Sequence, residues 1–245
     1  MSLERVALVT GSATGIGRAV AWRFADRGFA VTVNYSRSKL EAEETADGVR
    51  RRGAKVLVVA ANVADDAAVR AMVDRSVREL GGLDVLVNNA ATTHFIPHTD
   101  LEGITSQVWD DILDVNLKGT FFGCRAAMPH LKARRGNIVN IASVAGVTGS
   151  GSSIAYAASK GAVITLTKSL ARAFAPEVRV NAVAPGPVQT RWLADHQDMV
   201  DQAMTLTPMK RPATADDIAD VTLFLADGTS LMTGQVLVAD GGRTL

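Results

Sequence analysis

The chain has 245 residues, of which 47% are hydrophobic and 21% are charged, and its formal net charge is +1. This composition excludes a disordered or fibrous protein, and the length suits one large domain better than two domains with separate cores. The balanced charge gives no reason to expect nucleic acid or an anionic membrane as a partner. We therefore expect a single domain over residues 1–245.

Short apolar segments rich in Val and Ile alternate with longer segments that have the period of a helix. The predicted strands cover 6–10, 30–34, 56–60, 85–88, 137–141, 179–184 and 236–238, and the predicted helices cover about 16–27, 39–52, 66–80, 107–133, 154–174 and 215–226. This alternation predicts an α/β fold in which helices cover both faces of a parallel sheet. Thr214, followed by Asp217, is expected to cap the beginning of the last helix.

The longest stretch without a regular period runs from Pro185 to about Pro212. Stretches of this length inside compact domains usually carry function. We therefore predict a substrate lid at about 186–212.

Cys124 is the only cysteine, so no internal disulfide can form. It lies in an apolar helical stretch, where a free cysteine usually behaves as a small buried hydrophobe. The first residues run straight into a strand and leave no room for a signal peptide, and the apolar runs are shorter than the about 20 residues that cross a bilayer. We expect a cytoplasmic protein.

A glycine-rich loop, Thr10-Gly11-Ser12-Ala13-Thr14-Gly15-Ile16-Gly17, follows the first predicted strand and opens the first helix. Glycines let a backbone approach a pyrophosphate, and a helix N-terminus offers free N–H groups and a positive dipole end. The alternative is a turn that serves packing alone. The strand before the loop and the helix after it favour nucleotide binding.

The end of the second predicted strand reads Tyr35-Ser36-Arg37 and contains no acid. A carboxylate there would bond the 2′-hydroxyl of NAD, whereas basic or hydroxyl groups would receive the 2′-phosphate of NADP. The segment favours NADP(H) over NAD(H), with Ser36 and Arg37 as donors. The alternative is that Arg37 is a solvated cation at a helix start.

Taken in order, the motifs of the chain resemble those of the short-chain dehydrogenase/reductase family over essentially its whole length. Beyond the glycine loop, the matching motifs are Asn62-Val63, Asn88-Asn89-Ala90-Ala91, Asn116, Ser143, Tyr156 to Lys160, and Pro185-Gly186. The segments 34–35, 209–212 and 233–235 are most similar to the 3-oxoacyl-(acyl-carrier-protein) reductase branch. The resemblance implies a Rossmann-type, doubly wound parallel sheet of seven strands with a cofactor groove at the strand ends.

The resemblance also assigns roles to individual residues. Asn88 and Ala90 would line the nicotinamide side of the groove. The expected cofactor contacts are Gly11, Ser12, Thr14, Gly15, Ile16, Gly17, Tyr35, Ser36, Arg37, Asn62, Val63, Asn89, Ala90, Ala91, Tyr156, Lys160, Pro185, Gly186, Val188 and Thr190. Asn62 departs from an acid that is frequent in the family. Ala91 departs from a glycine, and its methyl group is expected to narrow the pocket.

Tyr156 and Lys160 are four residues apart in a predicted helix, so their side chains share one face. A tyrosine with its usual pKa of about 10 is a poor catalyst near neutral pH. An ammonium about 4 Å away would interact with its anion by about 4 kcal/mol at an effective dielectric of about 20, enough to lower that pKa into working range. Tyr156 would deliver a proton to the oxygen of a reduced carbonyl, and Ser143 would donate a second hydrogen bond to it.

The resemblance implies that Lys160 also holds the nicotinamide ribose and that Asn116 steadies a water that feeds protons to the lysine. Each residue has a structural alternative: a core tyrosine, a surface lysine, a strand-end serine and an asparagine that bonds backbone. The expected catalytic group is Asn116, Ser143, Tyr156 and Lys160.

Three segments are expected to shape the substrate pocket, namely 92–97, 149–153 and the lid. The candidate substrate contacts are His94, Ser143, Ser153, Tyr156 and Trp192, although a solvated loop position is the alternative for His94. No cluster of Cys, His or carboxylates has the spacing of metal ligands, so no catalytic metal is expected. An acyl-carrier substrate would call for basic residues near the pocket mouth; Lys132, Arg134, Arg135 and Arg172 are candidates, or else ordinary helix-surface charges.

The main functional hypothesis is an NADPH-dependent reductase of a ketone, with a 3-oxoacyl thioester as one candidate substrate. The second is an NAD(P)-dependent dehydrogenase of a sugar, polyol or steroid-like alcohol. The third is a non-catalytic dinucleotide-binding sensor, which would need the glycine loop but not the proton donor. The resemblance further implies a homo-oligomer, commonly a tetramer.

Overall fold

The computed structural model describes residues 4–193, 196, 200–201 and 205–245. In this part of the chain, seven parallel strands form one sheet in the order β3-β2-β1-β4-β5-β6-β7. The strands are β1 (Val6–Val9), β2 (Ala30–Tyr35), β3 (Val56–Ala60), β4 (Val85–Asn88), β5 (Asn137–Ile141), β6 (Arg179–Pro185) and β7 (Val236–Ala239). The order reverses between β1 and β4, and a sheet of this type binds ligands in the crevice at that reversal.

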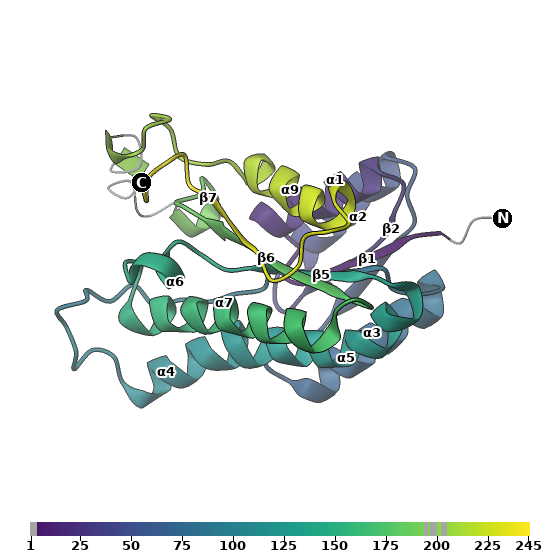
Figure 1. Cartoon of the computed structure of the whole chain (residues 1–245), viewed down its shortest axis with the longest axis horizontal. Helices are drawn as coiled ribbons and strands as arrows, with labels where there is room; N and C mark the ends of the chain where they lie inside the picture. Colours follow the sequence, from purple (N-terminus) through teal and green to yellow (C-terminus); the bar gives the residue numbers. More distant parts are fainter. Residues whose placement is uncertain (1–3, 194–195, 197–199, 202–204) are drawn as a thin grey trace.

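Helices cover both faces of the sheet (Figure 1). On one face lie α1 (Gly15–Asp26), α2 (Lys39–Arg51) and α9 (Ala215–Leu223). On the other lie α3 (Asp66–Leu80), α4 (Ser106–Leu113), α5 (Gly119–Arg134) and α7 (Ile154–Phe174), and the short α6 (Ala145–Thr148) follows β5. The predicted doubly wound, Rossmann-type fold is confirmed.

Each face of the sheet has its own apolar core. Phe24 and Phe29 are buried on the α1 face, with ring centroids 5.0 Å apart in an edge-to-face arrangement. Met72 and Leu131 are buried on the α3–α5 face. Strands β1, β4 and β5 are buried along their whole length, because helices cover both of their faces.

The predicted strands agree with the structure to within one residue at each end. The predicted helix over 107–133 is interrupted, because a π-helical turn, η1 (Asp114–Lys118), separates α4 from α5. The last predicted helix likewise ends in a π-helical turn, η3 (Phe224–Gly228). The predicted cap of α9 is confirmed, since Thr214 and Asp217 form a reciprocal capping box.

The predicted lid at 186–212 contains a short 3₁₀ turn, η2 (Arg191–Leu193), that the sequence period does not reveal. Residues 194–195, 197–199 and 202–204 of this segment lie outside the described residues, as do residues 1–3 of the N-terminus. The described lid is tied down where Val188 forms a parallel bridge with Ala213. It therefore crosses the end of the sheet between β6 and α9.

Candidate active site

The glycine-rich loop packs against the chain that follows β4. Gly11 and Gly15 have φ of 60° and 56°, a region that strongly favours glycine. A Cβ on Gly11 would lie 2.8 Å from Ala90 Cα, and a Cβ on Gly17 would lie 2.6 Å from Asn89 Nδ2. No side chain fits at these positions.

The loop ends in a helix terminus suited to an anion. Thr14 precedes α1 without a side-chain hydrogen bond to it, which leaves first-turn N–H groups free for a ligand. Crowded glycines and a free helix N-terminus are what a pyrophosphate requires. The residues therefore fit a dinucleotide.

Two polar side chains that the sequence does not single out hold this loop in place. The Thr10 hydroxyl accepts the backbone N–H groups of Asn89 and Ala90, each at 3.0 Å. Asn34 Oδ1 accepts the Gly11 N–H at 3.0 Å. Both are buried at the end of apolar strands, and a buried polar group in that place generally has a bonding task.

The Asn89 side chain is committed to the same framework. Its Nδ2 donates to the carbonyls of Thr10 at 2.9 Å and Gly11 at 3.0 Å. The Asn89 side chain therefore holds the glycine-rich loop in position.

The Asn88 side chain is buried and points away from that loop. It donates to Asn140 Oδ1 at 2.9 Å and to Cys124 Sγ at 3.3 Å. The expectation that Asn88 lines the nicotinamide side is wrong, because strand alternation aims its side chain below the groove.

Burial keeps the Cys124 thiol in its neutral form. It raises the pKa of this thiol to about 12, so the group is protonated at physiological pH. Cys124 behaves as the small buried hydrophobe that the sequence predicts.

Residues beyond β2 and β3 are those expected at the adenosine end of the groove. Ser36 and Arg37 are exposed directly after β2, while Tyr35 is half-buried. Asn62 is exposed, and its side chain accepts the Ala64 N–H at 3.1 Å. Val63 is buried beneath it, where a Cβ on Gly119 would approach Val63 Cγ2 to 2.8 Å.

The lid and the end of β6 close the groove from the other side. Thr190 lies over the glycine loop, since a Cβ on Gly15 would meet its methyl carbon at 3.3 Å. Gly186 packs against Asp240 so closely that a Cβ would lie 2.8 Å from Asp240 Cβ. Pro185 and Val188 are buried on either side of that contact.

Ser143, Tyr156 and Lys160 come together where β5 ends and α7 begins. Ser153 caps α7 by accepting the Tyr156 N–H at 3.2 Å, which fixes the turn that carries the tyrosine. Lys160 is buried, and its Nζ donates to the Ile141 carbonyl at 2.8 Å. Its Nζ also lies 5.8 Å from the centroid of the Tyr156 ring. The predicted face shared by Tyr156 and Lys160 is present.

Burial shifts both pKa values toward the neutral forms. It raises the pKa of Tyr156 to about 12, against the opposite effect of a hydrogen bond with Ser143. It lowers the pKa of Lys160 to about 8. The expectation that Lys160 lowers the tyrosine pKa does not describe this geometry, because desolvation has the largest effect on that pKa and the hydrogen bond with Ser143 is what opposes it.

The π-helical turn η1 turns Asn116 into the interior, where it is almost fully buried. Asn116 Oδ1 accepts the Thr92 N–H at 2.8 Å, and Nδ2 donates to the Thr92 carbonyl and to Ser159 Oγ, both at 3.0 Å. Ser159 in turn donates to the Tyr156 carbonyl at 2.7 Å. Asn116 therefore ties the loop after β4 to α7, and both hydrogens of its side-chain amide already donate to protein groups. The sequence pattern predicts neither this link nor the part that the Ser159 hydroxyl has in it.

We expect Asn116→Ala to destabilise the fold by about 2–3 kcal/mol, because it strands the buried partners of three hydrogen bonds. Since Thr92 lines the substrate cavity, KM for the substrate should also rise. Urea unfolding and steady-state kinetics measure the two effects. Gln107→Ala, which removes an exposed amide from α4, is the control and should stay within about 0.5 kcal/mol of the wild type. Equal stability of the two variants would contradict the structural role of Asn116.

A cavity of about 240 Å³ opens beside the tyrosine and is lined by Ala91, Thr92, Thr93, Phe95 and Trp192. Its walls combine two threonines with alanine, phenylalanine and tryptophan. The Trp192 ring lies 6.1 Å from the Tyr156 ring, between centroids. The lid thus places an aromatic surface beside Tyr156.

The two loops around the cavity are bonded to each other. Thr93 Oγ1 lies 2.6 Å from Ser152 Oγ, and the Ile96 N–H donates to the Ser152 carbonyl at 2.8 Å. Phe95 extends the contact to the lid, where it stacks on His196 with ring centroids 3.7 Å apart. The predicted segments 92–97 and the lid therefore line one cavity, and 149–153 supports it through its bonds to the 92–97 loop.

Two candidate substrate contacts have other tasks. Ser153 has no exposed surface, and its hydroxyl caps α7, so the expectation that it touches substrate is wrong. His94 is 42% exposed, and its Nε2 lies 3.1 Å from Asp111 Oδ2. That geometry matches the solvated loop position.

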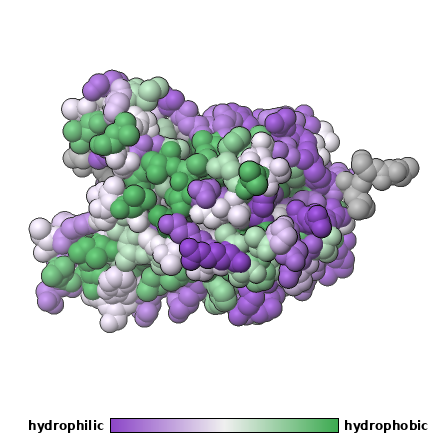
Figure 2. Space-filling view, in the orientation of Figure 1, coloured by the Kyte–Doolittle hydropathy of each residue, from purple (hydrophilic) through white to green (hydrophobic). Residues whose placement is uncertain are grey.

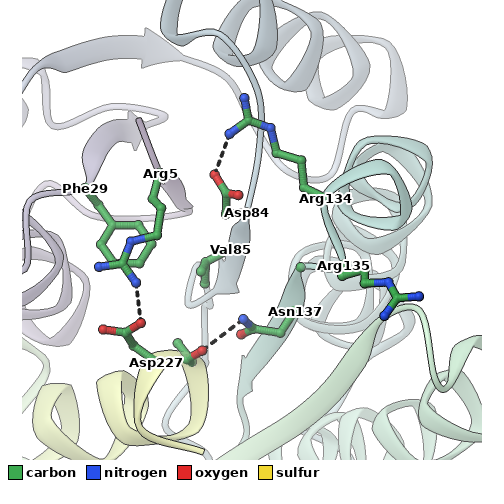
Figure 3. Close-up of a pocket in the computed structure, with 10 residues that line it drawn as sticks. Arg5, Phe29, Asp84, Val85, Arg134, Arg135, Asn137 and Asp227 are labelled. Carbon is green, nitrogen blue, oxygen red and sulfur yellow. Dashed lines mark hydrogen bonds and ion pairs between the residues drawn. The ribbon is translucent and has the colours of Figure 1, made fainter. Parts of the chain in front are cut away.

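A second cavity, of about 180 Å³, lies at the amino ends of the strands, away from the candidate active site (Figure 3). Arg134 bonds Asp84, and Arg5 pairs with Asp227 (Figure 3). Asn137 Nδ2 donates to the Ala226 carbonyl at 3.0 Å. Four of the charged groups that face this cavity therefore form two ion pairs, which fasten this end of the sheet.

This end of the sheet also holds the basic residues considered for an acyl carrier. Lys132, Arg134 and Arg135 end α5, and Arg172 lies in the last turn of α7. Helices that follow parallel strands end at the edge away from the groove. None of these four cations lines the cavity beside Tyr156, and their positions at helix ends are in line with ordinary helix-surface charges.

Within the described residues, no group of three or more His, Cys, Asp or Glu side chains is arranged to hold a metal ion. In the same residues, no helix is both long and apolar enough to cross a membrane.

The fold and this group of residues define a nicotinamide-dependent oxidoreductase that acts on alcohol or carbonyl groups. A family model described as enoyl-(acyl carrier protein) reductase matches residues 11–244. A Streptomyces violaceoruber protein assigned as ketoacyl reductase 2 of the granaticin polyketide synthase is 44% identical over 244 residues, covering 98% of this chain and 96% of that protein. The 3-oxoacyl-(acyl-carrier-protein) reductase FabG of Staphylococcus aureus is 41% identical over 248 residues, covering 99% of each.

Solved structures of short-chain dehydrogenases/reductases superpose closely on this chain. A short-chain dehydrogenase/reductase from Burkholderia xenovorans superposes with a TM-score of 0.94 at 38% identity, covering 99% of both chains. A double mutant of a Serratia marcescens short-chain dehydrogenase/reductase gives a TM-score of 0.90 at 34% identity, covering 100% of both. The chain belongs to the short-chain dehydrogenase/reductase family.

Proposed function

We propose that the protein reduces a ketone to a secondary alcohol with NADPH, and that Tyr156 is the proton donor. The observation that carries the proposal is the position of Ser143, Tyr156 and buried Lys160 beside a cavity, at the carboxyl ends of the strands of a Rossmann-type sheet. A protein that only senses cofactor needs the glycine loop but has no use for this group.

When bound, the reduced nicotinamide supplies a hydride to the carbonyl carbon. Tyr156 is protonated at neutral pH, because its pKa lies near 12, so it is ready to donate to the oxygen that becomes negative. Ser143 offers a second hydroxyl to the same oxygen. Lys160, mostly charged below its pKa of about 8, stabilises the tyrosinate that remains.

The preference for NADPH rests on the end of β2. Ser36 and Arg37 are exposed there, and no acid stands among residues 34–38 to accept the 2′-hydroxyl of NAD. The first turn of α2 follows directly. This corner suits a phosphate group better than a ribose hydroxyl.

Relatives narrow the substrate class. The names of two relatives describe reduction of a 3-oxoacyl or ketoacyl group, and a Xanthobacter autotrophicus relative that is 40% identical is named a 2-(R)-hydroxypropyl-CoM dehydrogenase. All three names concern a ketone or secondary alcohol, whereas the family model carries the name of an enoyl reductase. We favour carbonyl reduction, with a 3-oxoacyl thioester as the first substrate to test.

The test is oxidation of NADPH and of NADH at neutral pH against a 3-oxoacyl thioester, an enoyl thioester, simple diketones and keto sugars. We expect turnover with a ketone and a kcat/KM at least about ten-fold higher with NADPH. Turnover restricted to keto sugars or alcohols would favour the sugar, polyol or steroid-like dehydrogenase. Tight NADPH binding with no turnover across the panel would favour the sensor.

We further propose a cytoplasmic homo-oligomer, a tetramer by family resemblance. Strand β7 is the last strand of the sheet, and apolar residues gather over it (Figure 2). Phe224, Leu231 and Val238 at this edge are 47%, 92% and 45% exposed. An apolar surface at an unpaired sheet edge suits contact with a second copy.

We expect Val238→Asp to weaken the assembly, because it places a charge in an apolar contact. Light scattering coupled to size exclusion should show a smaller species, with circular dichroism unchanged. Leu40→Asp changes an apolar side chain that is 79% exposed on α2 and should keep the wild-type mass. A wild-type mass for Val238→Asp would place the interface elsewhere.

A further inference from the structure

The lid residue Arg191 reaches across the groove to the beginning of α2. Its Nη2 donates to Ser38 Oγ at 3.1 Å, and its Nη1 lies 3.6 Å from Glu41 Oε1. The side chain is 60% exposed, so its guanidinium can exchange these partners for others without disturbing the core.

The backbone that carries Arg191 is well placed for this reach. The Gln189 N–H donates to the Ala213 carbonyl at 2.8 Å, which ties the start of the lid to the segment before α9. Thr190 lies over Gly15 of the phosphate loop. Arg191 follows directly and therefore extends from above the pyrophosphate position toward the adenosine end.

The corner that Arg191 reaches is built for an anion. Arg37 is exposed, and within the described residues its side chain forms no hydrogen bond or ion pair. Ser38 precedes α2 without capping it, so first-turn N–H groups of this helix remain available. The Arg191 guanidinium, the Ser38 hydroxyl and the beginning of α2 meet at this corner directly after Arg37 in the sequence, and Glu41 is the carboxylate that pairs with Arg191 there. This donor set matches a phosphate monoester.

We propose that Arg191 is a specificity-determining residue that binds the 2′-phosphate of NADPH from the lid, opposite Arg37. The inference rests on the proposed preference for NADPH and adds a residue outside the expected cofactor contacts. On binding, the Arg191 guanidinium exchanges Ser38 for phosphate oxygens, while Glu41 stays within reach of its other edge.

This contact also links the two halves of the active site. Trp192, the next residue in the same 3₁₀ turn, lines the substrate cavity and lies beside Tyr156. A 2′-phosphate that holds Arg191 therefore also holds the aromatic wall of the substrate cavity. NADH, which lacks that phosphate, leaves η2 without this anchor.

The competing explanation is that Arg191 acts only as a latch, that is, its ion pair with Glu41 holds the lid against α2 whatever nucleotide is bound. The experiment measures dissociation constants of adenosine 2′,5′-bisphosphate and of 5′-AMP, which differ only in the 2′-phosphate. It uses the full-length wild type and the variants Arg191→Gln, Glu41→Gln and Arg51→Gln, with thermal melting as a check on folding. Arg51→Gln is the charge-matched control, because Arg51 is exposed in the last turn of the same helix.

For Arg191→Gln we expect binding of the bisphosphate to weaken by about 10- to 100-fold, the loss of one charge-assisted hydrogen-bonding group, while 5′-AMP changes by less than about two-fold. Glu41→Gln should tighten the bisphosphate, because it removes a negative charge beside the phosphate. Arg51→Gln should resemble the wild type.

Equal weakening of both ligands in Arg191→Gln, or no change in either, would overturn the proposal. So would weaker bisphosphate binding in Glu41→Gln, which is the result that a latch predicts. If the wild type itself does not distinguish the two ligands, the proposed NADPH preference fails and this inference falls with it. If the wild type distinguishes them and Arg191→Gln does so equally well, only this inference fails.

Discussion

Tyr156→Phe is expected to lower kcat for ketone reduction by about 10³-fold, within the range of about 10²–10⁴ for loss of a general acid. The substitution removes one hydroxyl and keeps the ring that faces Trp192. Affinity for NADPH should change little, because the glycine loop and the end of β2 are untouched. Stopped-flow kinetics and NADPH fluorescence titration measure the two quantities separately.

The matched control is Ser150→Ala, which removes a hydroxyl from the neighbouring 149–153 segment. Ser150 is exposed, and its Oγ lies 2.8 Å from Thr148 Oγ1. We expect its kcat to stay within about two-fold of the wild type. Wild-type turnover in Tyr156→Phe would remove the tyrosine from the mechanism and make the Ser143 hydroxyl the next proton donor to test.

The sheet could be predicted from the sequence because strands buried on both faces are continuously apolar. Val6–Val9 and Val85–Asn88 stand out for that reason, and the glycines that follow the first strand are explained by the crowding around Gly11 and Gly17. The spacing of Tyr156 and Lys160 needs only the period of a helix. These features depend on local rules, so one sequence is enough to find them.

Features that depend on tertiary contacts could not be predicted. The π-helical turn at Asn116 has no sequence period of its own. Ser153 resembles a pocket serine in the sequence, yet its hydroxyl is consumed by the cap of α7. Arg134 and Arg172 become helix-end charges only once the direction of their helices relative to the sheet is known.

The largest difference between the sequence-based prediction and the structure concerns the pKa values of Tyr156 and Lys160. The expected pairing of Lys160 with Tyr156 assumes two charges that attract at an intermediate dielectric, whereas the structure buries Lys160 against the Ile141 carbonyl. Desolvation then dominates, which raises the tyrosine pKa and lowers the lysine pKa. The result suits a reductase, since the donor stays protonated and the titratable partner is the lysine.

This assignment makes a definite statement about pH. A lysine whose pKa is lowered to about 8 is charged below that value and becomes neutral as the pH rises through it. Tyr156 stays protonated up to about pH 12 and adds no step in this range. The rate of the chemical step in ketone reduction should therefore be flat near pH 6–7 and fall as the pH rises above about 8.

Lys160→Met should abolish this alkaline limb and lower the rate at pH 7 by about 10²-fold or more, because a buried ammonium no longer stabilises the tyrosinate. Lys168→Met, which removes an exposed lysine two turns further along α7, should keep both the rate and the limb. Single-turnover rates from pH 6 to pH 10 test all three proteins. If the limb persists unchanged in Lys160→Met, another group titrates there. If the wild type shows no limb, the Lys160 ammonium is not required for proton transfer, and Tyr156 with Ser143 must stabilise the developing charge alone.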